Sequence, residues 1–204
     1  MAKKHKILAF SGSLREHAYS KRIVKTAIKG AENAGAEVTY IDLRDFPMPI
    51  YNADDHEQNG FDENALKLQR LLSEHNGLLV ASPEYNGSLS GALKNAIDWT
   101  SRPSGEFKMG EVYGGKVGAI MTESPGAFGG LRCLGHMRSI LSILGVNVLP
   151  SEIAVSKVST MFDGNDETMT DEKMKALLEN LGASLVDALQ KLHGEIEVVT
   201  DTRS

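Results

Sequence analysis

The feature that most constrains the fold is an alternation of short apolar runs with longer amphipathic segments. Five runs have the length and composition of strands, namely Lys6–Phe10, Glu37–Leu43, Leu78–Ser82, Lys116–Thr122 and Asn147–Ala154. The first, third and fourth are almost wholly apolar, as in parallel strands that are covered on both faces. The alternation therefore predicts repeated βα units, with helices on both sides of one sheet.

Segments of helical period lie between these runs and after the last one. The expected helices are Ser20–Ala34, Asp62–His75, Gly91–Trp99, Leu131–Leu144 and Asp171–Leu192. Gly35 stands where a glycine commonly ends a helix, and Thr170 followed by two acids is typical of a helix start. Pro47 and Pro49 predict a loop over Asp45–Asn59.

Right-handed crossovers leave few topologies for five parallel strands. We expect an α/β fold with the flavodoxin-like strand order 2-1-3-4-5, a doubly wound sheet in three α/β/α layers. A length of 204 residues suits one domain, so we expect residues 1–204 to form a single unit. Ligands of such sheets bind beyond the carboxyl ends of the strands, so the loops after strands one, three and four should hold the site.

Charge and composition argue against several classes of protein. The 22 basic and 27 acidic residues are mixed along the chain, without the basic stripe that nucleic acid requires. Ile7–Phe10 is too short for a signal-peptide core or a membrane span. Cys133 is the single cysteine and is expected to be a buried apolar residue. We therefore expect a cytoplasmic protein that binds neither nucleic acid nor membrane, and, because the histidines are scattered, no metal.

The loop after the first strand, Ser11–Ser20, is rich in hydroxyl groups and contains one arginine. Ser11, Ser13, Arg15 and Ser20, together with the backbone amides that begin the next helix, can bind one terminal phosphate. The loop contains neither G-x-G-x-x-G nor G-x-x-x-x-G-K-[ST], which argues against NAD or ATP as its primary ligand. The alternative is a solvent-facing loop in which Ser20 only caps the helix.

Two further loops combine unusual residues. The loop after the third strand reads Pro83-Glu84-Tyr85-Asn86-Gly87-Ser88, and such a turn can lay main-chain amides against the polar edge of a flat ring. A plain turn with Tyr85 packed at the edge of the core is the alternative. The loop after the fourth strand, residues 123–130, contains three glycines, which suit either a close approach to a ligand or simple flexibility.

At this point the loops show a resemblance. Ser82–Ser88 followed by Gly91–Trp99 resembles the signature of the NADPH-dependent FMN reductase family, which includes quinone, chromate and azo reductases. Gly12–Arg15 and Ser124–Gly130 match the other two FMN loops of the family in order and spacing. The resemblance covers residues 6–150. Two departures are Lys21, where an asparagine is common, and Ser90, which replaces the usual proline.

The resemblance implies FMN bound without a covalent bond, and it implies the residues that hold it. The phosphate would be held by Ser11, Ser13, Arg15 and Ser20 with His17 nearby, the isoalloxazine ring would be bordered by Pro83, Glu84, Tyr85, Asn86 and Gly87, and Ser124 and Gly126 would help to enclose it. The resemblance also implies a homodimer or homotetramer. Apolar residues around much of the expected helix Leu131–Leu144 agree with a face that contacts a partner subunit.

The implied activity is that of an FMN-dependent NAD(P)H oxidoreductase. It would transfer electrons from NADPH or NADH to small acceptors such as quinones, free flavin, azo compounds or chromate. The flavin supplies the reactive atoms, so no catalytic residue is assigned. One alternative is a flavodoxin-type electron carrier without nicotinamide reductase activity, although such carriers tend to be more acidic than a chain with a net charge of -5. Another is a phospho-receiver domain, which needs carboxylates where this chain has Ser11.

Overall fold

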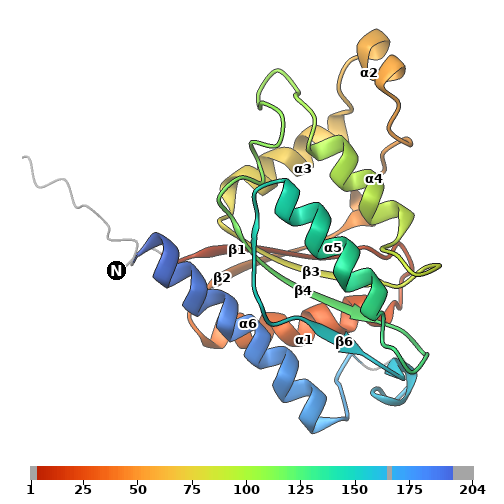
Figure 1. Cartoon of the computed structure of the whole chain (residues 1–204), viewed down its shortest axis with the longest axis vertical. Helices are drawn as coiled ribbons and strands as arrows, with labels where there is room; N and C mark the ends of the chain where they lie inside the picture. The colour runs from red at the N-terminus through yellow and green to blue at the C-terminus, as the bar shows by residue number, and fades with distance from the viewer. Residues whose placement is uncertain (1–3, 165–166, 195–204) are drawn as a thin grey trace, which may run out of the picture.

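A parallel sheet forms the middle layer of the computed structural model, which describes residues 4–164 and 167–194 (Figure 1). The strands are β1 (Lys6–Ser11), β2 (Glu37–Asp42), β3 (Gly77–Pro83), β4 (Val117–Glu123), β5 (Asn147–Val148) and β6 (Ile153–Val155). Their order is β2-β1-β3-β4-β5, and β6 also pairs with β4. The predicted flavodoxin-like order is therefore confirmed.

Helices cover both faces of this sheet (Figure 1). The helices on one face are α1 (Tyr19–Asn33) and α6 (Glu172–His193), and those on the other face are α3 (Glu63–Glu74), α4 (Gly91–Thr100) and α5 (Leu131–Ile143). Alternate residues of β1 enter opposite cores: Ile7 packs with α1 and α6, whereas Leu8 packs on the other side. The central strands β1, β3 and β4 are almost wholly apolar because both of their faces are buried.

The last predicted strand, Asn147–Ala154, is wrong as one continuous strand. The structure divides it into β5, which pairs with Val117 and Gly118, and β6, which pairs with β4 from Met121 to Glu123. Pro150 lies between them and has no amide with which to continue the ladder. The Arg138 guanidinium donates to the carbonyl oxygens of Val148 and Leu149 at this break.

The predicted loop Asp45–Asn59 is also partly wrong, because it contains a short helix, α2 (Ala53–Asn59), and follows a 3-10 turn, η1 (Leu43–Asp45). The Asn52 side chain caps α2 by accepting a hydrogen bond from the Asp54 amide. No residue of α2 is buried, so the helix leaves no apolar periodicity in the sequence.

Helix ends differ from the prediction by small shifts. Asp171 rather than Thr170 caps α6, since its carboxylate accepts a hydrogen bond of 2.8 Å from the Met174 amide. Gly35 has a φ of +96° and follows the last turn of α1, as predicted. Among the helices of residues 4–164 and 167–194, none is long and apolar enough to cross a membrane.

Candidate functional site

A cavity of about 170 Å³ opens at the carboxyl edge of the sheet, between the loops that follow β1, β3 and β4. Its lining residues are Ser13, Arg15, Ala18, Tyr19, Pro83, Glu84, Tyr85, Glu123 and Pro125. Parallel strands end at the same edge, so the fold brings together loops that are far apart in the sequence. The three predicted loops therefore meet at one place.

Two larger cavities lie outside this junction. One of about 450 Å³ lies at the amino edge of the strands, where the Lys116 ammonium donates to the His75 carbonyl and so caps the end of α3. The other, of about 340 Å³, is mainly apolar and contacts the loop after β1 only through Leu14. Neither combines residues of all three loops, so we take the 170 Å³ cavity as the candidate site.

Three buried serines organise the loop after β1. The Ser11 hydroxyl donates to the Ser20 hydroxyl over 2.9 Å, and the Ser13 amide donates to the Ser11 oxygen over 3.1 Å. The Arg15 amide in turn donates to the Ser13 oxygen over 3.2 Å. These bonds hold the loop in one conformation, with its backbone directed by its own side chains.

The start of α1 leaves a natural place for an anion. Ala18 occupies the N-cap position and offers no side-chain acceptor to the first amides of the helix. Ser20 lies inside the first turn, so it does not cap the helix as the alternative interpretation proposed. The helix start, the three buried serine hydroxyls and the exposed Arg15 guanidinium together offer the kinds of donor that a terminal phosphate needs.

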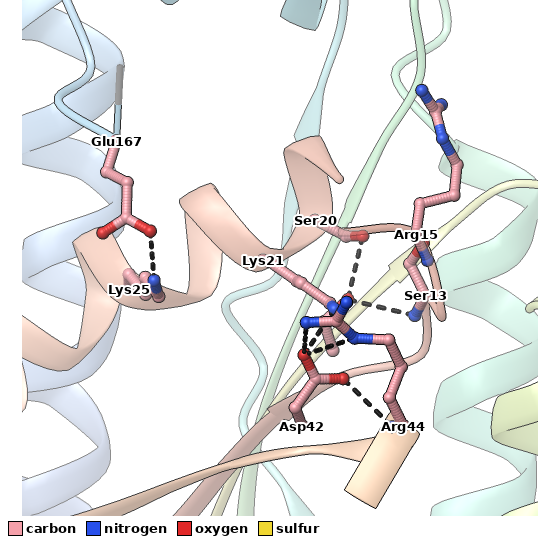
Figure 2. A network of polar contacts seen from close by, with 9 residues as sticks. Ser13, Arg15, Ser20, Lys21, Lys25, Asp42, Arg44 and Glu167 are labelled. Atoms are coloured by element: carbon pink, nitrogen blue, oxygen red, sulfur yellow. Dashed lines mark hydrogen bonds and ion pairs between the residues drawn. The ribbon is translucent and has the colours of Figure 1, made fainter. Parts of the chain in front are cut away.

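Lys21, one of the two departures from the family pattern, belongs to a neighbouring polar network (Figure 2). Its ammonium lies 2.6 Å from the Asp42 carboxylate at the end of β2, and Arg44 contacts the same carboxylate at 2.9 Å. Burial acts to raise the pKa of Asp42, but the hydrogen bonds from Arg44 and Lys21 outweigh it and hold the pKa below its usual range. Lys21 thus pairs with a carboxylate, while Arg15 extends away from this network.

The loop after β3 contains a tight turn. The amides and carbonyls of Tyr85 and Ser88 exchange hydrogen bonds of 2.9 and 3.1 Å. Asn86 and Gly87 between them have φ values of +51° and +79°, as in a type I′ turn, which explains the Asn-Gly pair. The Tyr85 side chain is 48% exposed, so it does not pack at the edge of the core.

Glu84 and Ser90 tie this loop to its neighbours. The Glu84 carboxylate accepts hydrogen bonds of 3.1 Å from the amides of Arg132 and Cys133, and so caps the start of α5. The Ser90 hydroxyl accepts from the Leu93 amide and donates to the Gly12 carbonyl. Ser90, which replaces the usual proline, therefore caps α4 and connects the loop after β3 to the loop after β1.

The glycines after β4 serve packing more than ligand approach. A Cβ atom on Gly129 would lie 2.6 Å from the Ser156 amide nitrogen, and one on Gly130 would lie 2.7 Å from the Thr122 hydroxyl. Gly126 is exposed, and its amide donates to the Ser124 hydroxyl over 3.1 Å. Gly129 and Gly130 are thus required by the close contact of the loop with β4 and β6.

The predicted residues fall into three groups. Ser13, Arg15, Pro83, Glu84 and Tyr85 line the cavity, and Ser11 and Ser20 support the loop through hydrogen bonds. The remaining five, His17, Asn86, Gly87, Ser124 and Gly126, do not line the cavity. His17 is exposed to solvent, and Asn86 and Gly87 form the turn beyond the lining residues.

Sequence reasoning missed Glu123, an acid that is only 6% exposed and lines the cavity at the last position of β4. Burial raises the pKa of Glu123 to about 7, although the Ser20 backbone amide and the Arg15 charge act in the opposite direction. Its signal in the sequence is a carboxylate that directly ends an apolar strand. The predicted strand stopped at Thr122, which left Glu123 as the first residue of the glycine-containing loop without a role of its own.

Comparisons with known proteins identify the family of this chain. Residues 5–160 match the family described as NADPH-dependent FMN reductase. The chain is 34% identical over 179 residues to the NAD(P)H-dependent FMN reductase PA1204 of Pseudomonas aeruginosa, with 87% of this chain and 92% of that protein covered. It is 35% identical over 150 residues to a quinone reductase of Escherichia coli K12, with 73% and 76% covered.

A solved structure is also similar over most of its length. FerB from Paracoccus denitrificans, a flavoenzyme NAD(P)H:(acceptor) oxidoreductase, superimposes with a TM-score of 0.74 at 26% identity, and 92% of this chain and 98% of that chain are covered. The sheet order, the three loops and the family match therefore agree. This chain belongs to the NADPH-dependent FMN reductase family, whose members are flavin-dependent oxidoreductases that take electrons from NAD(P)H.

Proposed function

We propose that this chain binds FMN non-covalently at the carboxyl edge of the sheet and passes electrons from NADPH or NADH to small acceptors. The acceptor classes are quinones, free flavin, azo compounds and chromate. The observation that carries the proposal is the meeting of three loops at one cavity, of which one has the donors for a terminal phosphate. The names of PA1204, the quinone reductase and FerB support NAD(P)H as donor and quinones among the acceptors.

Each loop has a distinct part in this proposal. Ser11, Ser13 and Ser20 shape the phosphate loop, and Arg15 supplies the positive charge for the phosphate. The segment Pro83–Gly87 borders the isoalloxazine ring. Its backbone is held by the turn at Asn86 and by the hydrogen bonds that the Glu84 carboxylate accepts from the start of α5. His17, Ser124 and Gly126 complete the proposed set, from positions beyond the cavity wall.

A bound flavin supplies the group that accepts a hydride from the nicotinamide and returns electrons to the second substrate. The protein binds the flavin and orients it relative to the substrates. The half-exposed Tyr85 ring lies beside the cavity, which leaves that side open to substrates of different shape. Donor and acceptor would then use the same face in turn, and we expect ping-pong kinetics.

The test mixes the FMN-loaded protein with NADPH or NADH in the absence of oxygen. Loss of the flavin absorbance within seconds supports a reductase, and its re-oxidation by a quinone identifies the acceptor class. The second candidate function, a flavodoxin-type electron carrier, predicts that neither nicotinamide bleaches the flavin. An absorbance spectrum that shows no bound flavin after incubation with FMN would contradict both candidate functions.

The same proposal covers three properties of the whole chain. Residues 1–204 form one FMN-binding domain, the protein assembles as a homodimer or homotetramer, and it works in the cytoplasm. Assembly is supported by the family resemblance and by Leu131 and Ile143 of α5, which are 58% and 86% exposed. The cytoplasmic location is supported by the single cysteine, which suits a reducing compartment.

A further inference from the structure

Glu123 occupies part of the donor set that the proposed function assigns to the flavin phosphate. Glu123 is the last residue of β4, and it is almost fully buried. Its side chain lines the cavity together with Ser13 and Arg15. The Ser20 backbone amide in the first turn of α1 and the charge of Arg15 both favour the charged form of Glu123, against the effect of burial on its pKa. A carboxyl group thus already lies beside the amide and the cation that would receive a phosphate.

The groups that face Glu123 cannot neutralise a second anion. The titratable groups are Arg15 from the loop after β1, Tyr19 from α1, Glu84 and Tyr85 from the loop after β3, and Cys133 from α5. Among the described residues that line the cavity, Arg15 is the only cation. Burial raises the pKa of the Cys133 thiol to about 12, so it stays neutral. Glu84 is already bonded to Arg132 and to the start of α5, so a phosphate here would share the one lining cation, Arg15, with Glu123.

We infer that Glu123 couples FMN binding to proton uptake, because the phosphate is accepted only when the Glu123 carboxyl group is neutral. This inference rests on the proposed function. A carboxylate and a phosphate that share one amide and one guanidinium repel each other, whereas a protonated carboxyl group can donate its O–H to a phosphate oxygen.

The burial of Glu123 makes this exchange feasible near neutral pH. Its pKa is raised to about 7, so the neutral form is already half populated at that pH. Below pH 7 the Glu123 carboxyl group is already mostly neutral, so phosphate binding does not require it to take up a proton. Above pH 7 it must first take up a proton, and each pH unit then lowers FMN affinity by up to about tenfold. The second ionisation of a phosphate group, at a pKa of about 6, is complete in this upper range.

The experiment titrates the flavin-free protein with FMN and with riboflavin between pH 6 and pH 9, following flavin fluorescence. For the wild type, the FMN dissociation constant should rise above pH 7, while that of riboflavin, which has no phosphate, should stay constant. Glu123→Gln is permanently neutral and should bind FMN equally well from pH 7 to pH 9. At pH 9 the variant should therefore bind FMN up to about 100-fold more tightly than the wild type.

Glu16→Gln is the matched control, because it removes an exposed carboxylate from the same loop and should keep the wild-type pH dependence. The same slope in Glu123→Gln as in the wild type would overturn the inference while leaving FMN binding intact. Failure of the wild type to bind FMN at every pH would remove the proposed function instead.

A second measurement covers the case in which Glu123→Gln does not fold. Calorimetry of FMN binding to the wild type at pH 8, in two buffers with different ionisation enthalpies, counts the protons that are taken up. Uptake close to one proton supports the inference, and uptake close to zero contradicts it.

Discussion

In the loop after β1, different residues fix the backbone and supply the positive charge of the candidate anion site. Ser11, Ser13 and Ser20 use their hydroxyl groups on one another and on the backbone, so they fix the loop. Arg15 is exposed and lines the cavity, which leaves its guanidinium accessible to a ligand. The loop and its charge can therefore be tested separately.

Replacing Arg15 with alanine should weaken FMN but spare riboflavin. A hydrogen bond to a charged group contributes about 1.5–3 kcal/mol, so FMN affinity should fall roughly 10- to 150-fold. Titrations at pH 6.5 keep most of Glu123 neutral and so separate the two residues. Equal losses for both flavins would mean that Arg15 only supports the loop, and no loss for either would place the phosphate elsewhere.

The ion pair between Lys21 and Asp42 should stabilise the fold. Because both side chains are largely buried and Arg44 still contacts Asp42 without Lys21, Lys21→Met should cost about 1–3 kcal/mol at pH 7. The control is Lys25→Met on the same helix, which breaks an exposed pair with Glu167 (Figure 2) and should cost less than about 1 kcal/mol. Urea unfolding measures both free energies.

The pH dependence of that loss follows from the lowered pKa of Asp42. A carboxyl group whose pKa is lower in the folded state adds stability above its unfolded pKa, and this stability is lost as the pH falls through the folded pKa. The cost of Lys21→Met should thus be constant from pH 8 to pH 5 and smaller below about pH 4. A cost that does not change under acid conditions would show that packing, not charge, is what Lys21 contributes.

The helices α1 and α6 pack so closely that their backbones touch. A Cβ atom on Gly182 would lie 2.0 Å from the Ala27 carbonyl oxygen, and one on Gly30 would lie 1.8 Å from the Glu179 carbonyl oxygen. Neither glycine has an unusual backbone conformation, since neither has a positive φ. Both are needed because two helix backbones touch at this crossing, which covers the face of β1 and β3 below the site.

Gly182→Ala should therefore destabilise the fold despite alanine's better helix propensity. Overpacking costs about 1–3 kcal/mol, which exceeds the propensity gain of about 1 kcal/mol. The matched control is Gly135→Ala on α5, where a Cβ atom meets nothing within 4 Å and the change should be neutral or stabilising. Thermal unfolding of both variants tests this, and a stabilised Gly182→Ala would mean that the helices can separate at little cost.

At the scale of the whole molecule, the outer face of α5 bears on assembly. Leu134, Met137 and Leu141 pack against the sheet, so most of the helix's apolar residues serve the core. Ile140 and Leu144 are partly buried there as well. What remains outside is Leu131 and Ile143, at the two ends of the helix.

If α5 contacts a partner subunit, Ile143→Asp should shift the protein toward monomers. A charge in an apolar contact is desolvated without a partner, which weakens association. Leu177→Asp is the control, because Leu177 is exposed on α6 across the sheet. Light scattering on the three proteins measures the mass. A monomeric wild type, or equal masses for all three, would leave α5 as a cover for the sheet alone.

The sequence by itself determined the βα alternation and the three loops that follow the first, third and fourth strands, because local periodicity and loop motifs are visible within short segments. For the strand order it left a few topologies with right-handed crossovers, of which the expected flavodoxin-like order is one. The family resemblance also rested on contiguous residues such as Ser82–Ser88. Short-range patterns were sufficient here because each one describes an element or a turn that forms from its own neighbours.

Only the tertiary structure decided which side chains meet. Glu123 is next to Ser20 and Arg15, and Lys21 pairs with Asp42, because parallel pairing aligns the ends of β4, β1 and β2. At the break between β5 and β6, Arg138 reaches from α5 to the carbonyl groups of Val148 and Leu149. Such contacts join residues that are distant in the chain, and burial sets the pKa of Glu123 only once they have formed. No local pattern encodes a desolvation that distant segments create together.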